Sequence, residues 1–227
     1  MINLLWDVIA AKGFEKTMYF EQAAVDIRAL PKLEGTVHVN IALIVKFMPN
    51  FFFAPADCPE IPRRDDAADD AFLFDQGQAR GLGSIRFHDY RRAFAAFDLP
   101  NVQVFARQVD AFREMLASAP PNESQTKDTD FLLAGGELFA LVVYAQLILE
   151  NARLYAIAPD LVDQIFDFMV RDFADCALQL HGKSASTPAQ MRQCLQMIAK
   201  PVTDERRYDA VWKELVLALD GAYEMNA

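Results

Sequence analysis

The chain has 227 residues, of which 53% are apolar and 24% are charged, and its formal net charge is −10 at pH 7. This apolar content is enough to build a folded core, which excludes an intrinsically disordered chain. The negative charge repels phosphate backbones and anionic lipid headgroups, so we expect no nucleic acid and no lipid surface as a partner. Three dispersed cysteines indicate a reducing compartment, and residues 1–6 lack the basic start of a secretory signal, so we expect a cytoplasmic protein.

Three short helices are predicted in the first part of the chain, because apolar residues recur at helical spacing and each run is followed by Gly or Pro. They span residues 1–12, 19–30 and 36–48. Phe51–Phe53 follow as an apolar plug. Residues 54–87 contain scattered Pro and Gly and a charged run, which predicts a long irregular connector.

Helical periodicity continues from residue 88 to the end of the chain. The predicted helices are 88–97, one that begins between Asp98 and Pro100 and ends at Pro120, 128–156, 159–181, one from Thr187 to Pro201, and a last one that begins after Thr203. The near absence of strand alternation predicts an all-α fold, with a helical segment 1–53, the connector 54–87 and a helical bundle 88–227.

Local signals in the second part predict helix ends and buried faces. Thr187 and Gln190 have the spacing of a capping box, and Thr203 is the expected cap of the last helix. His181 is expected as a cation at a helix C-terminus. In the last helix, the residues expected to face inward are Tyr208, Val211, Trp212, Leu215 and Leu219.

The stretch from Phe131 to Leu149 approaches the length of a membrane span. It contains Glu137 and Gln146, and a carboxylate at bilayer depth is costly. We therefore predict a buried helix of the bundle and no membrane span, with a membrane-associated helix pair as the weaker alternative.

Metal and nucleotide motifs are missing from the sequence. His38, His88 and His181 are not preceded by Glu at the spacing that di-iron bundles use, and there is no Cys-x-x-Cys pair or Gly-rich phosphate loop. We expect no metal site. Cys58 is predicted to be a loop thiol, and Cys176 and Cys194 to pack in the core.

The segment from Gly13 to Asn40 carries a more specific pattern. It contains Gly13-Phe14, Glu21, Asp26 and Glu34-Gly35-Thr36, with 34 − 13 = 21 residues from the first Gly to Glu34. In these residues and their spacing the chain resembles the carboxy-terminal helical domain of the flavin-dependent acyl-CoA dehydrogenases. The later helices look like the extra helical tail of longer members of that family.

The resemblance implies a fold, a reaction and a site. The fold is an acyl-CoA dehydrogenase C-terminal-like helical bundle with a second helical tail bundle. The reaction is α,β-desaturation of an acyl-CoA thioester, with FAD as cofactor and an electron-transfer flavoprotein as acceptor. Glu34 corresponds to the catalytic base, and Gly35, Thr36 and His38 correspond to residues beside the flavin.

The family's amino-terminal domain and middle β-domain have no counterpart in the sequence. We therefore expect activity to need a chain that supplies them, or a longer product, and we expect self-association. A second hypothesis is a catalytically silent helical interaction module derived from the family, because Ala10 and Ala11 stand where the family has paired glycines. In that case Glu34-Gly35-Thr36 serves as a helix-start signal.

Overall fold

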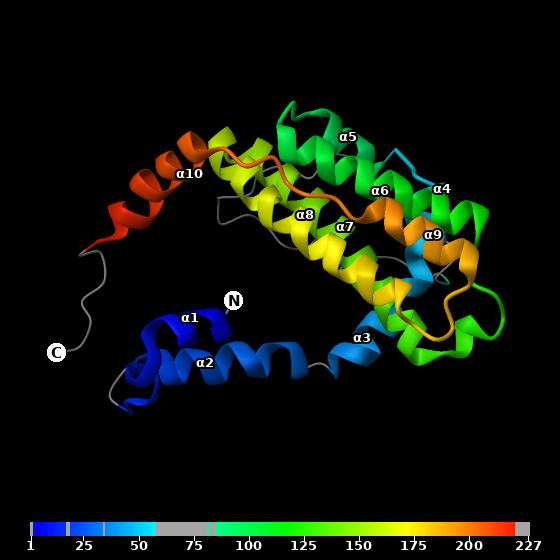
Figure 1. Ribbon diagram of the computed structural model, residues 1–227, viewed down its shortest axis with the longest axis horizontal. Helices are drawn as coiled ribbons and strands as arrows, with labels where there is room; N and C mark the ends of the chain where they lie inside the picture. Colours follow the sequence, from blue (N-terminus) through cyan, green and yellow to red (C-terminus); the bar gives the residue numbers. More distant parts are fainter. Residues whose placement is uncertain (1, 17–18, 34, 58–80, 82–84, 221–227) are drawn as a thin grey trace, which may run out of the picture. The chain divides into compact units, whose positions relative to one another are not determined.

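The computed structural model describes residues 2–16, 19–33, 35–57, 81 and 85–220, and they form helices joined by turns and loops (Figure 1). The described residues contain no strand, so the predicted all-α class is confirmed. Contacts within the chain define two compact units, one of residues 41–208 and one of residues 1–40 with 209–227. Residues 41–53 therefore pack with the bundle, whereas the boundary predicted from the sequence follows Phe53.

Unit 41–208 is a bundle of long helices that lie against one another (Figure 1). α8 packs against α6, α7 and α9, and α9 also packs against α6. The helices of this unit are α4 (Met48–Phe53), α5 (Tyr90–Ala95), α6 (Pro100–Ser118), α7 (Thr129–Leu154), α8 (Pro159–His181) and α9 (Pro188–Met197). The helices from α5 to α9 follow the predicted ranges closely, whereas α4 was not predicted as a helix, and His181 is the last residue of α8 as expected.

Side chains at the helix starts explain several of these boundaries. Asp128 accepts a hydrogen bond from the Phe131 N–H at the start of α7. At α9 the capping box of Thr187 and Gln190 is confirmed, with both reciprocal bonds present. The predicted cap of the last helix is wrong: Asp204, and not Thr203, accepts from the Arg207 N–H at the start of α10 (Glu205–Val211).

Aromatic rings fill the centre of the bundle. Phe51 and Phe52 are 2% and 3% exposed, and both belong to α4, so they are part of a helix and not a plug after it. Phe51 stacks on Tyr90 and meets Phe139 of α7 edge to face. Other fully buried rings of this core are Phe105, Phe112, Phe166 and Phe173. Such contacts fix α4 and α5 onto α6, α7 and α8.

Within the described residues, α7 is the one single helix that is long and apolar enough to cross a membrane. Together, residues 19–32 and 37–53 also pass that test as one bent pair. Leu138, Val142 and Leu149 of α7 are fully buried within the bundle. Core helices of soluble proteins can have the same length and composition as a membrane span. The burial of these side chains favours a helix of the bundle, and the lack of a membrane span stays a prediction.

The second unit consists of short helical segments. They are α1 (Ile2–Ile9), the 3₁₀ turn Ala10–Phe14, α2 (Tyr19–Ala29), the start of α3 (Val37–Ile44), and the π- and 3₁₀-helical turns Trp212–Val216 and Leu217–Leu219. Trp6 packs against Phe14 and Phe20, and the Arg28 guanidinium lies over its ring. These contacts join α1, the 3₁₀ turn and α2.

The surface of this unit is rich in apolar side chains. Val8 is 80% exposed, and five further apolar side chains are 45–72% exposed: Leu5, Phe14, Val25, Leu33 and Val39. The prediction that the last helix faces inward is wrong for most of its residues: Tyr208, Trp212, Leu215 and Leu219 are each more than 40% exposed. The α-helical spacing that led to this prediction is interrupted, because α10 ends at Val211 and a π turn and a 3₁₀ turn follow, and spacing alone does not show whether a neighbouring helix covers a face.

Candidate functional site

The predicted site segment lies at the start of α3. Gly35 has φ +104°, a backbone conformation that favours glycine, and Thr36 follows it. The Thr36 Oγ1 accepts a hydrogen bond from the Val39 N–H at 3.3 Å, which is the geometry of a helix cap. Gly35, Thr36 and His38 are all exposed. Glu34, the predicted base, lies outside the described residues.

The residues just before Gly13 also have an unusual backbone. Ala10 has φ +52°, a left-handed conformation that costs a residue with a Cβ about 1–2 kcal/mol. Gly13 lies against the Trp6 indole, where a Cβ would be only 2.6 Å from Nε1. Position 13 therefore requires glycine for close packing, and position 10 would be more stable with glycine.

These observations bear on whether an anionic dinucleotide could bind at this segment. The start of a helix presents backbone N–H groups to an anion. Thr36 and His38 are exposed and able to donate hydrogen bonds, so they fit a polar contact to such a group. The Thr36 oxygen accepts from the Val39 N–H, and the hydroxyl proton of Thr36 is still able to donate to an anionic group.

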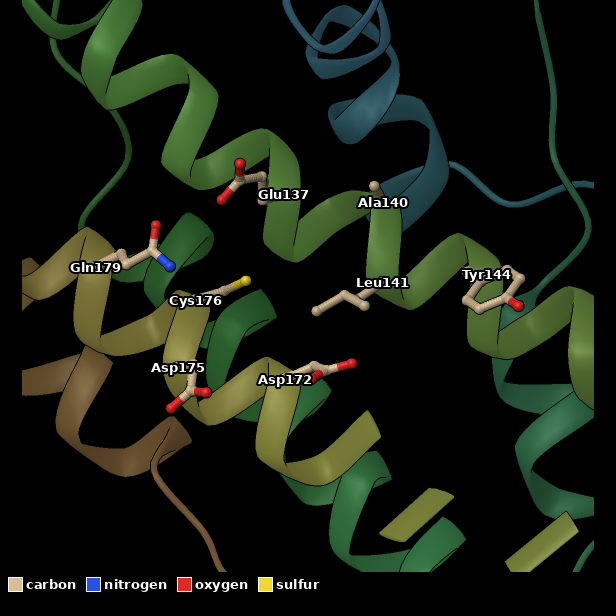
Figure 2. A pocket seen from close by; sticks show the side chains of 8 residues that line it. All are labelled: Glu137, Ala140, Leu141, Tyr144, Asp172, Asp175, Cys176 and Gln179. Carbon is tan, nitrogen blue, oxygen red and sulfur yellow. The ribbon is translucent and has the colours of Figure 1, made fainter. Parts of the chain in front are cut away.

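A separate feature of the bundle is a groove between α7 and α8, here named the α7–α8 groove (Figure 2). It has a volume of about 530 Å³ and is open to solvent along one side. In Figure 2, Leu141 and Cys176 point into the space between the two helices. The groove is lined by Glu137, Ala140, Leu141 and Tyr144 from α7 and by Asp172, Asp175, Cys176 and Gln179 from α8.

Electrostatics within the α7–α8 groove are dominated by its carboxylates. Partial burial and then the charge of Asp175 raise the pKa of Asp172. The pKa of the Cys176 thiol is raised to about 11, first by burial and then by the nearby Glu137, Asp172 and Asp175. Cys176 is therefore a thiol at neutral pH and not an activated nucleophile. Cys194 is buried in the core as predicted, whereas Cys176 is only partly buried and packs against the core, and Cys58 lies outside the described residues.

A buried ion network lies elsewhere in the bundle. Arg207 donates to Asp163 at 2.5 Å and lies 3.5 Å from Asp167, and these side chains are 4–6% exposed. The Arg207 Nη2 also donates to the Val202 carbonyl at 3.0 Å. Because every charge is paired in a dry environment, this network holds residues 202–207 against α8 and is not accessible to a substrate.

Sequence reasoning missed both the groove and this network. A signal for the network existed: Asp163 and Asp167 are four residues apart and share the apolar face of α8 with Phe166 and Val170, so a buried cation partner was required. The groove had no comparable signal, because its lining depends on how α7 packs against α8.

In the part of the chain that the structure describes, no three His, Cys, Asp or Glu side chains lie close enough together to hold a metal ion. Comparisons with protein-family models, with curated proteins and with solved structures found no match.

Proposed function

We propose that the chain supplies the catalytic-base segment and the helical tail of a flavin-dependent acyl-CoA dehydrogenase acting in the cytoplasm. The observation that carries the proposal is the order and spacing of Gly13-Phe14, Glu21, Asp26 and Glu34-Gly35-Thr36, which match the family's carboxy-terminal helical domain. The finer fold, an acyl-CoA dehydrogenase C-terminal-like bundle with a second helical tail bundle, belongs to the same proposal.

Backbone geometry supports this assignment at two of the matched positions. The left-handed φ of Gly35 explains why glycine follows the proposed base and precedes the capping Thr36. Ala10, a departure from the paired glycines of the family, has a positive φ that glycine would adopt more readily than the alanine present. Gly13 is also required by its packing against Trp6.

Glu34 has two chemical tasks in the proposed reaction. Its carboxylate removes the α-proton of the acyl-CoA thioester, while the β-carbon gives up a hydride and the Cα–Cβ bond becomes a double bond. FAD, if bound, would supply the acceptor for that hydride, and an electron-transfer flavoprotein would take up the electrons. Enolate charge on the thioester oxygen needs a hydrogen-bond donor, which the Glu34 backbone N–H would supply.

Gly35, Thr36 and His38 would position the cofactor. All three are exposed, so they are available to a group that approaches the start of α3. The described residues contain no strand, so a β-domain that encloses the flavin would come from a partner chain or a longer form of this chain. The exposed apolar side chains of α1 and α2, such as Val8 and Val25, support such an association or the formation of a homo-oligomer.

A second candidate is a catalytically silent helical interaction module. The observation that favours it is the Thr36 cap, because a Glu-Gly-Thr segment that starts a helix has a structural role without any cofactor. The presence of Ala11 in place of a second glycine is also consistent with a lost flavin site.

Flavin content separates the two candidates. The chain is purified from its native cells together with the chains that associate with it, and bound FAD is measured by visible absorbance and by release on denaturation. The enzyme proposal predicts bound FAD that is lost in Thr36→Val and retained in Thr36→Ser, which keeps the hydroxyl. A colourless protein that takes up no added FAD would support the silent module instead.

A further inference from the structure

The α7–α8 groove has one wall on each of the two helices. On α7, Glu137, Leu141 and Tyr144 are spaced four and three residues apart and so share one face. On α8, the same spacing places Asp172, Cys176 and Gln179 on one face. From Glu137 to Tyr144 the groove follows about two helical turns, or roughly 10 Å. It is therefore long enough to hold a short helix.

Unpaired negative charge gathers in this groove. Within the residues that the structure describes, no hydrogen bond or ion pair engages the carboxylates of Glu137, Asp172 and Asp175. Other carboxylates of the same two helices are paired: Asp130 of α7 with Lys183 at 2.7 Å, and Asp167 of α8 with Arg171 at 2.8 Å. No Lys or Arg side chain lines the groove, so its three carboxylates favour a positively charged occupant.

Apolar surface continues beyond the charged part of the groove. Tyr144 is 59% exposed, and Leu147, three residues further along α7, is 50% exposed. On α8, Phe168 lies one helical turn before Asp172 and is 60% exposed. A soluble protein rarely leaves large apolar side chains together at a groove unless a partner covers them.

The occupant must match this combination of carboxylates and apolar side chains. The groove is open along one side, so it would not enclose a small molecule as binding pockets do. An amphipathic helix can place apolar side chains over Leu141, Tyr144 and Cys176 while its Lys or Arg residues reach the carboxylates. We propose that the α7–α8 groove is a docking site for a basic amphipathic helix of a partner protein. This inference rests on the bundle alone and is independent of the proposed activity.

A designed peptide tests the proposal directly. The probe is a fluorescent, helix-stapled peptide of about 14 residues with Leu at i, i+4 and i+7 and Lys on both flanks, because isolated helices of this length are marginal. Its binding to the full chain is measured by fluorescence anisotropy. We expect saturable binding that is weakened at least tenfold by Asp172→Asn with Asp175→Asn, and also by Leu141→Gln.

Matched controls make the outcome specific. Asp98→Asn with Glu114→Gln removes the same charge from exposed positions outside the groove and should leave the peptide affinity unchanged. Three outcomes would overturn the proposal. A peptide with Glu in place of Lys could bind as tightly as the Lys peptide, the control variant could weaken binding as much as the groove variants do, or the Lys peptide could show no saturable binding. Spermine is the second probe. If its binding is weakened by Asp172→Asn with Asp175→Asn but not by Leu141→Gln, the groove is a site for a small polycation and the proposal is overturned.

Discussion

Arg207 donates a hydrogen bond to Asp163 across 2.5 Å, and both side chains are 4% exposed. The pair joins α10 to the face of α8 that carries the core, and Asp167 and the Val202 carbonyl complete the surroundings of the guanidinium. Asn101 at the start of α6 contributes to the same network, because its N–H donates to Asp163 at 2.8 Å. One buried cation therefore ties together three parts of the bundle.

Removing this cation should destabilise the bundle strongly. Arg207→Ala leaves Asp163 buried without its cation and Asp167 with Arg171 alone, and we expect the free energy of unfolding to fall by about 3–5 kcal/mol. Arg206→Ala is the matched control, because Arg206 is 75% exposed and lies 3.6 Å from Asp160, and it should cost less than about 1 kcal/mol. Urea unfolding measures both. A loss for Arg207→Ala no larger than for Arg206→Ala would contradict a stabilising role of the network.

Two adjacent glycines of α7 should respond in opposite directions. A Cβ at Gly136 would lie 2.2 Å from Ile41 Cγ2 and 2.9 Å from Val45 Cγ1, so Gly136→Ala should destabilise by about 1–3 kcal/mol. A Cβ at Gly135 meets nothing within 4 Å, so Gly135→Ala should stabilise by about 0.5–1 kcal/mol through its helix propensity. Thermal unfolding of the two variants compares them. Similar effects would show that residues 41–45 do not pack on α7.

The phenylalanine run of α4 offers a second paired test. Phe52→Ala opens a cavity beside Tyr90, Phe112 and Phe139 and should cost about 3–5 kcal/mol. Phe53 is 45% exposed and contacts the Arg113 guanidinium and the neighbouring Phe52 ring, so Phe53→Ala should cost about 1 kcal/mol. The free energies of unfolding of the two variants give the comparison, and equal losses would refute the placement of Phe52 in the core.

Thiol chemistry reports on the charge of the α7–α8 groove. With its pKa raised to about 11, Cys176 is only about 0.1% thiolate at pH 8, so its rate of exchange with an aromatic disulfide should rise about tenfold per pH unit up to that pKa. In a Cys58→Ser, Cys194→Ala background only Cys176 remains. Asp172→Asn with Asp175→Asn removes negative charge that opposes the thiolate, so the pKa should fall and the rate at pH 8 should increase.

The control for that experiment is again Asp98→Asn with Glu114→Gln, which should leave the rate unchanged. A thiol that titrates near its ordinary value in the unmodified groove would contradict the assigned burial and charge. An unchanged rate after the loss of Asp172 and Asp175 charge would show that burial alone raises the pKa.

Local patterns in the sequence predicted the long helices well, because their signals are close together in the chain. Thr187 and Gln190 identified the start of α9, and Pro159 with Gly182 bounded α8. Phe51–Phe53 were predicted to follow a helix because Pro49 was expected to end it. Pro49 instead lies in the first turn of α4. Proline is tolerated there because backbone N–H groups in the first turn make no hydrogen bond within the helix.

Features that depend on packing were not predictable in the same way. The spacing of Tyr208 and Trp212 predicted a common helix face, but their exposure depends on what lies beside that face. Glu137 was identified only as a costly charge within an apolar stretch, because its neighbours Asp172 and Cys176 are supplied by α8. The site residues Gly35, Thr36 and His38 were found through a resemblance, and the geometry of α3 adds their backbone conformation and exposure.

The assignment of Glu34 as the catalytic base is tested most directly by the reduction of bound flavin. The protein is purified with its associated chains, mixed anaerobically with acyl-CoA thioesters, and followed by the loss of visible flavin absorbance. We predict rapid bleaching by the wild type and by the exposed control Glu15→Gln, and retained flavin without bleaching in Glu34→Gln. Bleaching by Glu34→Gln at the wild-type rate would contradict the central claim.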